Sequence, residues 1–256
     1  MEWGFVVAGL LVGFIVGMTG VGGGSLMTPI LLWFGIPAST AVGTDLLYAA
    51  LTKAGGVVVH HSQKHVDWKL VMTLAAGSVP ASLLTLLFLS TLPAGGEHQD
   101  ALLRFMLGVA LFLTALAILG KGWLLQRVPE RFRAADFVPS PRLVALVGAV
   151  LGFLVTLSSI GAGALGTLAL FLLYPLLPTT RLIGSEIAHA VPLTLVAGLG
   201  HAGLGNVEWS LLFTLLCGSL PGIWLGSHLA GRVHDRFLRP ALAIMLAIIG
   251  AKLMVV

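Results

Sequence analysis

Two glycine-rich stretches interrupt apolar segments of the chain, "MTGVGGGS" at 18–25 and "LSSIGAGA" at 157–164. Glycine weakens a helix by about 1 kcal/mol relative to alanine, so each stretch predicts a break between two short helices. The second helix then begins with free N–H groups and the positive end of its dipole, which attract anions. We therefore interpret the two stretches as the halves of one anion-binding site. Its predicted residues are Thr19, Gly20, Gly22, Gly23, Gly24, Ser25, Ser158, Ser159, Gly161 and Gly163.

Small residues also let helices pack closely, and this is the alternative explanation for each glycine cluster. For a single cluster, close packing would be the favoured interpretation. Here two clusters occupy matched positions, and each is followed by a short apolar run, at 25–36 and 164–177. Paired discontinuous helices are typical of the substrate sites of transporters, so the pair of clusters favours the binding site.

Two acids, Asp45 and Glu186, lie near the start of two apolar segments. A carboxylate within a membrane segment is rare and usually functional, and it could carry a coupling proton. The alternative is a charge at a helix N-terminus near the membrane surface, favoured by the helix dipole, with Thr44 and Ser185 as caps. Both interpretations stay open. His189 lies one turn after Glu186 and is included as a possible partner in coupling.

Lys53 lies in the middle of the apolar segment 40–60. A lysine at membrane depth must face a cavity or an acid. Asp45, eight residues earlier, lies on roughly the same helical face and is one candidate. We include Lys53 in the predicted site as a counter-charge for the anion.

The histidines and the single cysteine predict neither a metal site nor a cofactor. His60 and His201 lack cysteine or carboxylate neighbours at the spacing of metal ligands. Cys217 is alone in the sequence, which excludes an internal disulfide. An intramembrane hydrolase could use Ser159 as nucleophile with His189 or His201 as base, but nothing in the sequence brings these side chains together.

The composition places these residues in a membrane. The chain has 256 residues, of which 57% are hydrophobic and 9% charged, and its mean hydropathy is +1.03. A water-soluble domain carries about 25% charged residues, so we expect an all-α polytopic membrane protein. The net charge of +4 comes from basic residues between apolar runs, a pattern that the positive-inside rule explains without nucleic-acid binding.

An internal duplication relates the two glycine stretches. "GFIVGMTGVGGGSLMT" at 13–28 matches "GFLVTLSSIGAGALGT" at 152–167, and the pairs "GTDL" and "GSEI", "VDWKL" and "VEWSL", and "GSVP" and "GSLP" follow in the same order. Matched acidic, tryptophan and Gly-Ser-x-Pro positions exceed chance similarity between apolar segments. We therefore divide the chain into a first membrane repeat (1–123), a basic cytoplasmic linker (124–142) and a second membrane repeat (143–256).

The charges of equivalent loops predict that the halves are inverted repeats. The loop at 60–69 is basic and its counterpart near 203–209 is acidic, whereas the loop at 93–101 is acidic and its counterpart at 231–236 is basic. This exchange is expected if the halves insert in opposite directions. Each half would then contain a glycine-broken helical hairpin and three transmembrane helices, with both termini outside.

The glycine break after a first apolar run, the following "GTDL", the basic linker and the duplication resemble the TauE/SafE family over essentially the whole chain. These are sulfite and organosulfonate exporters, also called the toluene-sulfonate uptake permease group. The resemblance implies a multi-pass protein of the inner (plasma) membrane. It also implies secondary transport of a small anion, such as sulfite, thiosulfate or sulfoacetate, coupled to protons or sodium. The second break, "SSIGAGA", departs from the family pattern and offers more hydroxyl groups.

Other functions stay open at this point. Broken helices also serve anion channels, which the sequence alone does not separate from transporters. No P-loop is present, so ATP-driven transport by this chain is not expected. The expected partners are the anionic substrate, membrane lipid and a second copy of the chain in a homodimer.

Overall fold

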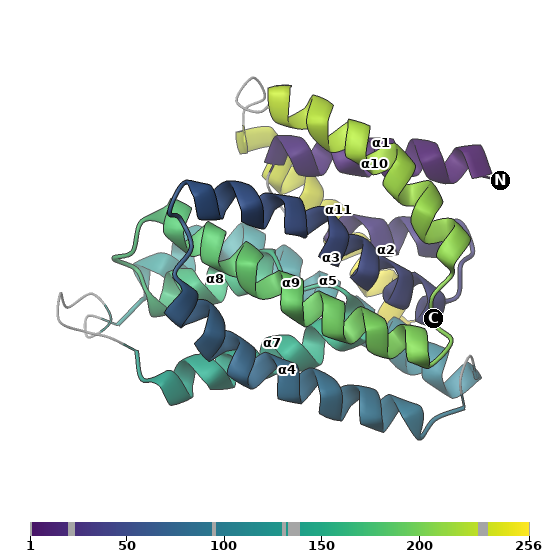
Figure 1. The fold of residues 1–256 in the computed structure, drawn as a ribbon, viewed down its shortest axis with the longest axis horizontal. Helices are drawn as coiled ribbons and strands as arrows, with labels where there is room; N and C mark the ends of the chain where they lie inside the picture. Colours follow the sequence, from purple (N-terminus) through teal and green to yellow (C-terminus); the bar gives the residue numbers. More distant parts are fainter. Residues whose placement is uncertain are drawn as a thin grey trace.

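The computed structural model describes residues 2–19, 24–93, 96–129, 132, 139–229 and 235–255, which form ten helices and no strand (Figure 1). The first five are α1 (Glu2–Thr19), α2 (Gly24–Trp33), α3 (Ala38–Ser62), α4 (Trp68–Ser90) and α5 (Glu97–Gln126). The other five are α7 (Pro141–Ser158), α8 (Ala164–Leu173), α9 (Thr179–Gly203), α10 (Trp209–Leu229) and α11 (Asp235–Val255). The all-helical prediction is confirmed.

Five of the described helices, α3, α4, α5, α7 and α9, are long and apolar enough to cross a membrane, and shorter apolar helices accompany them. Their outer surfaces suit lipid. On α4, for example, Leu83, Leu84, Leu87 and Phe88 are each more than half exposed. The chain is therefore a multi-pass membrane protein. Its largest internal core joins α2, α3, α5 and α10 through side chains such as Met27, Tyr48, Leu111 and Leu215.

The helices that follow the glycine stretches are short. α2 and α8 have ten residues each, which at 1.5 Å per residue gives about 15 Å. The hydrocarbon core of a bilayer is about 30 Å thick, so neither helix can cross it alone. Each short helix occurs where its glycine stretch predicted one. The connection between α5 and α7 is shorter than the predicted linker, because α7 already begins at Pro141. Ser140 is its N-cap residue, and proline is well suited to the first position of a helix.

The first helix of each half packs against the other half. α1 packs against α10 so closely that a Cβ atom on Gly9 or Gly13 would overlap the backbone at Leu215 or Ser219. α7 packs in the same way against α4, with Gly148 against Leu74 and Gly152 against Ser78. Because the residue numbers rise together in both pairs, the helices of each pair are parallel. The first helix of each half therefore packs mainly on the fourth helix of the other half.

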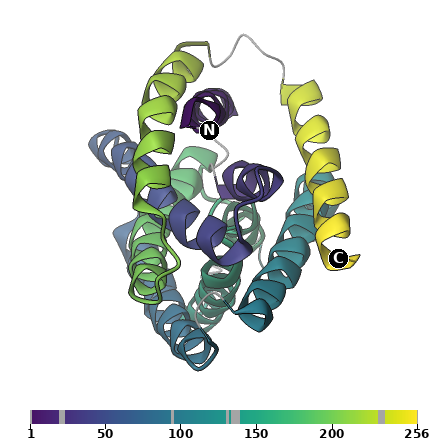
Figure 2. The same ribbon diagram turned by 90° about the vertical axis from the view of Figure 1, so that its right-hand side faces the viewer.

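The equivalent helices α3 and α9 lie side by side and run in opposite directions. Gly43 of α3 faces the backbone of Asn206 and the side chain of His201, just beyond and within the last turn of α9. At the other end, Gly184 of α9 faces His65 and His60 in the same manner. Both ends of the described chain lie at the end of the molecule that faces the viewer in Figure 2. The loop between α3 and α4 and the start of α7 lie at the opposite end in Figure 1.

Candidate functional site

The second glycine stretch forms a sharp break between α7 and α8. Ser159 and Gly161 have left-handed backbone conformations, with φ of 57° and 120°, and these end α7 and redirect the chain. Gly163 is the N-cap residue of α8, and as a glycine it has no side chain that could accept a hydrogen bond from the helix. The N–H groups of Gly166 and Thr167 are bonded within the break. Among the described residues, no acceptor pairs with the N–H groups of Ala164 and Leu165, the first two of α8, so these two remain able to bind a ligand.

A small buried cavity adjoins this break. Its volume is about 10 Å³, close to the minimum for one water molecule. It is lined by Ala49, Lys53, Thr114, the chain from Ser159 to Ala164, and Thr194. The hydroxyl oxygens of Ser159 and Thr114 are buried and have no hydrogen-bond partner in the described part of the chain. The cavity therefore combines unused polar groups with a closed conformation that is too small for a sulfur oxyanion.

Lys53 supplies the positive charge of this cavity. Its side chain is buried, and its ammonium group donates a hydrogen bond to the carbonyl oxygen of Ala162, inside the break. Lys53 is within electrostatic reach of both Glu186 and Asp45. Neither carboxylate forms a direct ion pair with it in the regions that the structure describes. Lys53 thus lies at the second break, and its part as a counter-charge for the anion stays a prediction.

The carboxylate of Asp45, on α3, lies next to residues of α2 and of the second break. Thr28, in the second turn of α2, donates a hydrogen bond to its carboxylate, and Ser159 lies beside it. The structure therefore brings the first turns of α2 and the second break to the same carboxylate. Thr28 was not among the predicted site residues, although the repeat alignment, which matches it to Thr167, marks it as a matched polar position.

Several predicted residues of the first break lie outside this description. Gly20, Gly22 and Gly23 are outside the described residues, as are the side chains of Thr19 and Ser25. Gly24 is the first residue of α2. In the second break, the Ser158 hydroxyl donates to the backbone carbonyl of Leu154 and accepts from the N–H of Ile160, so it stabilises the break itself. The part that these residues take in substrate binding stays a prediction.

The two acids are buried, and the interpretation of Thr44 and Ser185 as caps of their helices is wrong. Asp45 is 0% and Glu186 3% exposed, each at the eighth position of its helix. The hydroxyl of Thr44 accepts the N–H of Glu208 at 3.1 Å. The Ser185 hydroxyl accepts the N–H of Asp67 at 2.8 Å. Each hydroxyl therefore holds a loop of the opposite half.

Two buried histidines contact neighbouring helices. His189 Nε2 lies 2.8 Å from Ser78 Oγ of α4, instead of pairing with Glu186. His201 Nε2 lies 2.9 Å from the carbonyl oxygen of Thr156 on α7. Neither contact joins a histidine to Ser159, as a hydrolase would require. Ser78 was missed as a partner, although the repeated Gly-Ser-x-Pro motif contains it. Within the described residues, no three His, Cys, Asp or Glu side chains gather as metal ligands.

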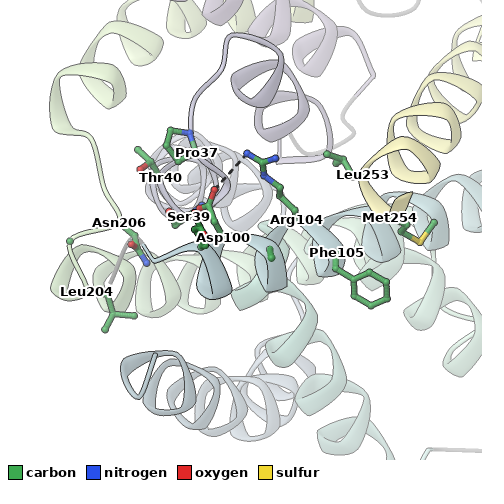
Figure 3. Close-up of a pocket in the computed structure, with 13 residues that line it drawn as sticks. Pro37, Ser39, Thr40, Asp100, Arg104, Phe105, Leu204, Asn206, Leu253 and Met254 are labelled. Carbon is green, nitrogen blue, oxygen red and sulfur yellow. Dashed lines mark hydrogen bonds and ion pairs between the residues drawn. The ribbon is translucent and has the colours of Figure 1, made fainter. Parts of the chain in front are cut away.

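A larger open pocket lies at the end of the molecule that holds the termini (Figure 3). Its volume is about 750 Å³, and it is lined by the start of α3, the start of α5 and the loop after α9. Asp100 accepts the N–H groups of Ala38 and Ser39 at 3.2 and 2.9 Å, and so caps α3. Arg104 lies 3.8 Å from the same carboxylate and is 45% exposed. This pocket presents a guanidinium group to solvent.

Comparison with known proteins identifies the family. The family described as "Sulfite exporter TauE/SafE" matches residues 5–253. The probable membrane transporter protein YjnA of Bacillus subtilis is 39% identical over 254 residues, which cover 99% of this chain and all of the relative.

More distant relatives carry the same description. The probable membrane transporter protein YdhB of Bacillus subtilis is 25% identical and covers 95% of this chain and 96% of the relative. A probable membrane transporter protein of Methanocaldococcus jannaschii is 25% identical, with 96% of this chain and 92% of the relative covered. No solved structure gives a significant match. The chain is a membrane transporter and not an enzyme, and it belongs to the TauE/SafE sulfite exporter family.

Proposed function

We propose that the protein is a secondary transporter that moves small sulfur-containing anions across the plasma membrane, coupled to a proton or sodium gradient. The observation that carries this proposal is the meeting of a free helix N-terminus, unused hydroxyl groups and the Lys53 ammonium group at one buried cavity. Such a set of donors suits an oxyanion. The description of the family as sulfite exporters supports this substrate class.

We also propose that the two halves are inverted repeats, each with a glycine-broken hairpin and three membrane-spanning helices. In support, the equivalent helices α3 and α9 run in opposite directions. Charge supports an orientation as well. Lys64, Lys69, Arg142 and Arg181 belong to the end of the molecule opposite the termini, which the positive-inside rule assigns to the cytoplasm.

The closed cavity and the open pocket suggest a transport path. The cavity of about 10 Å³ must widen to admit an anion. The pocket of about 750 Å³ is the proposed entrance from the outer side, where Arg104 attracts anions to its mouth. An anion channel is the second candidate, since broken helices line channels too. The small cavity favours a transporter, which keeps its site closed to one or both sides.

Reconstituted vesicles test this function. Purified protein in proteoliposomes is assayed for uptake of radiolabelled sulfite, thiosulfate, sulfoacetate and taurine, each with an imposed proton gradient, an imposed sodium gradient or none. We expect at least one of these compounds to accumulate above its external concentration under one ion gradient. A Lys53→Gln variant serves as a matched control and should lose most uptake. Equilibration without accumulation would identify a channel, and no movement of any of the four would contradict the proposal.

A further inference from the structure

The two matched acids have unequal surroundings. Asp45 accepts a hydrogen bond from the Thr28 hydroxyl, and the Ser159 hydroxyl lies beside it. Among the described residues, Glu186 has no such donor. One oxygen of each acid, Asp45 Oδ1 and Glu186 Oε1, is buried without a hydrogen-bond partner in this part of the chain. The Glu186 oxygen lies against the first turn of α8, where a Cβ atom on Gly166 would be 3.0 Å away. A carboxylate that accepts hydroxyl donors is stabilised in its charged form, whereas one without donors is not.

Lys53 is within electrostatic reach of both acids, and Glu186 has the larger electrostatic effect on it of the two. The other helices packed on α9 add no further charge at this depth. α3 contributes Lys53 and Asp45, and α8 contains no ionisable residue. α4 and α7 carry Lys69 and Arg142 only, in their first turns. His189, on α9 itself, is held by Ser78.

We propose that Glu186 is the carboxylate that carries a coupling proton, and that Asp45 is a positioning residue that holds α2 against α3. This inference rests on the proposed transport function and deepens it, because it states which acid couples and in which direction. With Glu186 ionised, its charge compensates Lys53. An anion entering then would leave an uncompensated negative charge in a buried site, which is strongly unfavourable. With Glu186 protonated, the site has lost one negative charge, and the anion replaces that charge beside Lys53 while Asp45 stays as it was.

The proton balance follows from this competition. Glu186 takes one proton from the water on the side to which the site is open, and the anion binds next to Lys53. Both leave to the other side, where Glu186 releases the proton to water and again compensates Lys53. One proton therefore moves with each anion, in the same direction. A proton gradient directed into vesicles drives uptake, and the reversed gradient opposes it.

The first experiment uses [³⁵S]thiosulfate, which stays fully ionised near neutral pH, in proteoliposomes. The parent should accumulate thiosulfate when the vesicle interior is alkaline. Glu186→Gln should lose accumulation while it still exchanges labelled for unlabelled thiosulfate, because exchange needs no proton release. Asp45→Asn should lower accumulation and exchange by the same factor, because a positioning residue affects both. Glu186→Asp, which keeps a titratable group, should restore accumulation in part. Accumulation by Glu186→Gln, or faster parental uptake under the reversed proton gradient, would overturn the proposal.

The second experiment needs no substrate, so it separates this inference from the proposed function. Infrared difference spectra of the reconstituted protein between acidic and alkaline buffer should show the carbonyl stretch of a buried protonated carboxyl group. This band should be absent in Glu186→Gln, present in Asp45→Asn and shifted in Glu186→Asp. Its absence in the parent, or its persistence in Glu186→Gln, would overturn the role of Glu186. If none of the four compounds is transported while the band behaves as expected, only the proposed substrate class fails.

Discussion

The two ends of the α3–α9 pair are built from equivalent residues, yet in the part of the chain that the structure describes an ion pair holds one end and not the other. At the end opposite the termini, the Asp67 N–H donates to Ser185, and the Asp67 carboxylate lies 3.1 Å from the guanidinium group of Arg181. At the other end, the N–H of Glu208 donates to Thr44 in the same way. Thr40 occupies the position equivalent to Arg181, and it lines the open pocket.

This difference shows how a duplicated scaffold acquires two distinct ends. At both ends, a loop N–H group of one half donates a hydrogen bond to a hydroxyl group of the other half, so the contacts between the halves are symmetric. The ion pair lies at the end opposite the pocket of about 750 Å³, and among the described residues no equivalent pair lies beside the pocket. The difference between Arg181 and Thr40 therefore distinguishes the two ends, while the backbone contacts stay alike.

The largest expected effect concerns which side of the membrane each end faces. Single cysteines at the exposed residues Lys64 and Ser210, each in a Cys217→Ala background, lie at opposite ends of the α3–α9 pair. A membrane-impermeant maleimide applied to intact cells should label the cysteine at position 210 and not the one at position 64, and lysis should expose both. Labelling of both positions from the same side would contradict the inverted arrangement.

The next effect concerns the contact shared by both ends. Gly43→Val and Gly184→Val place a side chain against the backbone oxygens of Asn206 and His65, which cannot move aside without separating the halves. Each variant should lose about 3 kcal/mol of stability, the upper range for overpacking. Thermal unfolding in detergent would show this as a lower Tm for both. Gly203→Ala, where the added atom meets open space, is the control. A normal Tm for either valine variant would mean that the ends are not equally tight.

A smaller effect distinguishes the two breaks between these ends. Ser159 lies where the repeat alignment has Gly20, and its φ of 57° suits glycine at least as well. Ser159→Gly therefore removes a hydroxyl from the cavity without adding backbone strain. We expect substrate affinity to fall by about 1 kcal/mol, or roughly fivefold, with unchanged stability. Equilibrium binding of the transported anion measures this, and unchanged affinity would exclude the hydroxyl as a ligand.

The smallest effect comes from making the two ends alike. Asp67→Asn keeps the cap of α4 but removes the ion pair, and Arg181→Thr copies the residue found at the other end. The Arg181 side chain is 47% exposed, so the pair contributes at most about 1 kcal/mol. The labelling rate of a cysteine at Lys64 should rise up to about fivefold in either variant. The double variant should show no further increase. An additive increase would mean that the two residues act separately.

The sequence predicted the parts of this structure that depend on local pattern or on the repeat. The second glycine stretch predicted the break before α8, and both stretches predicted the short helices that follow them. Lys53, in the middle of an apolar segment, is buried. The incorrect parts involve contacts between the halves. Thr44 and Ser185 resemble helix caps locally, but their partners lie 164 and 118 residues away. His189 pairs with Ser78 at a separation of 111 residues, which spacing on one helix does not reveal.

The packing of the first helix of each half against the other half has a consequence for biosynthesis. α1 leaves the ribosome first, but the helix that covers its glycine face, α10, follows about two hundred residues later. At about 5–20 residues per second, the first helix waits on the order of ten seconds or more for its partner. During this time its close-packing surface faces lipid or the insertion machinery. The packing of α1 therefore begins only after α10 has been made, and a chain that stops before α10 leaves α1 without its main contact.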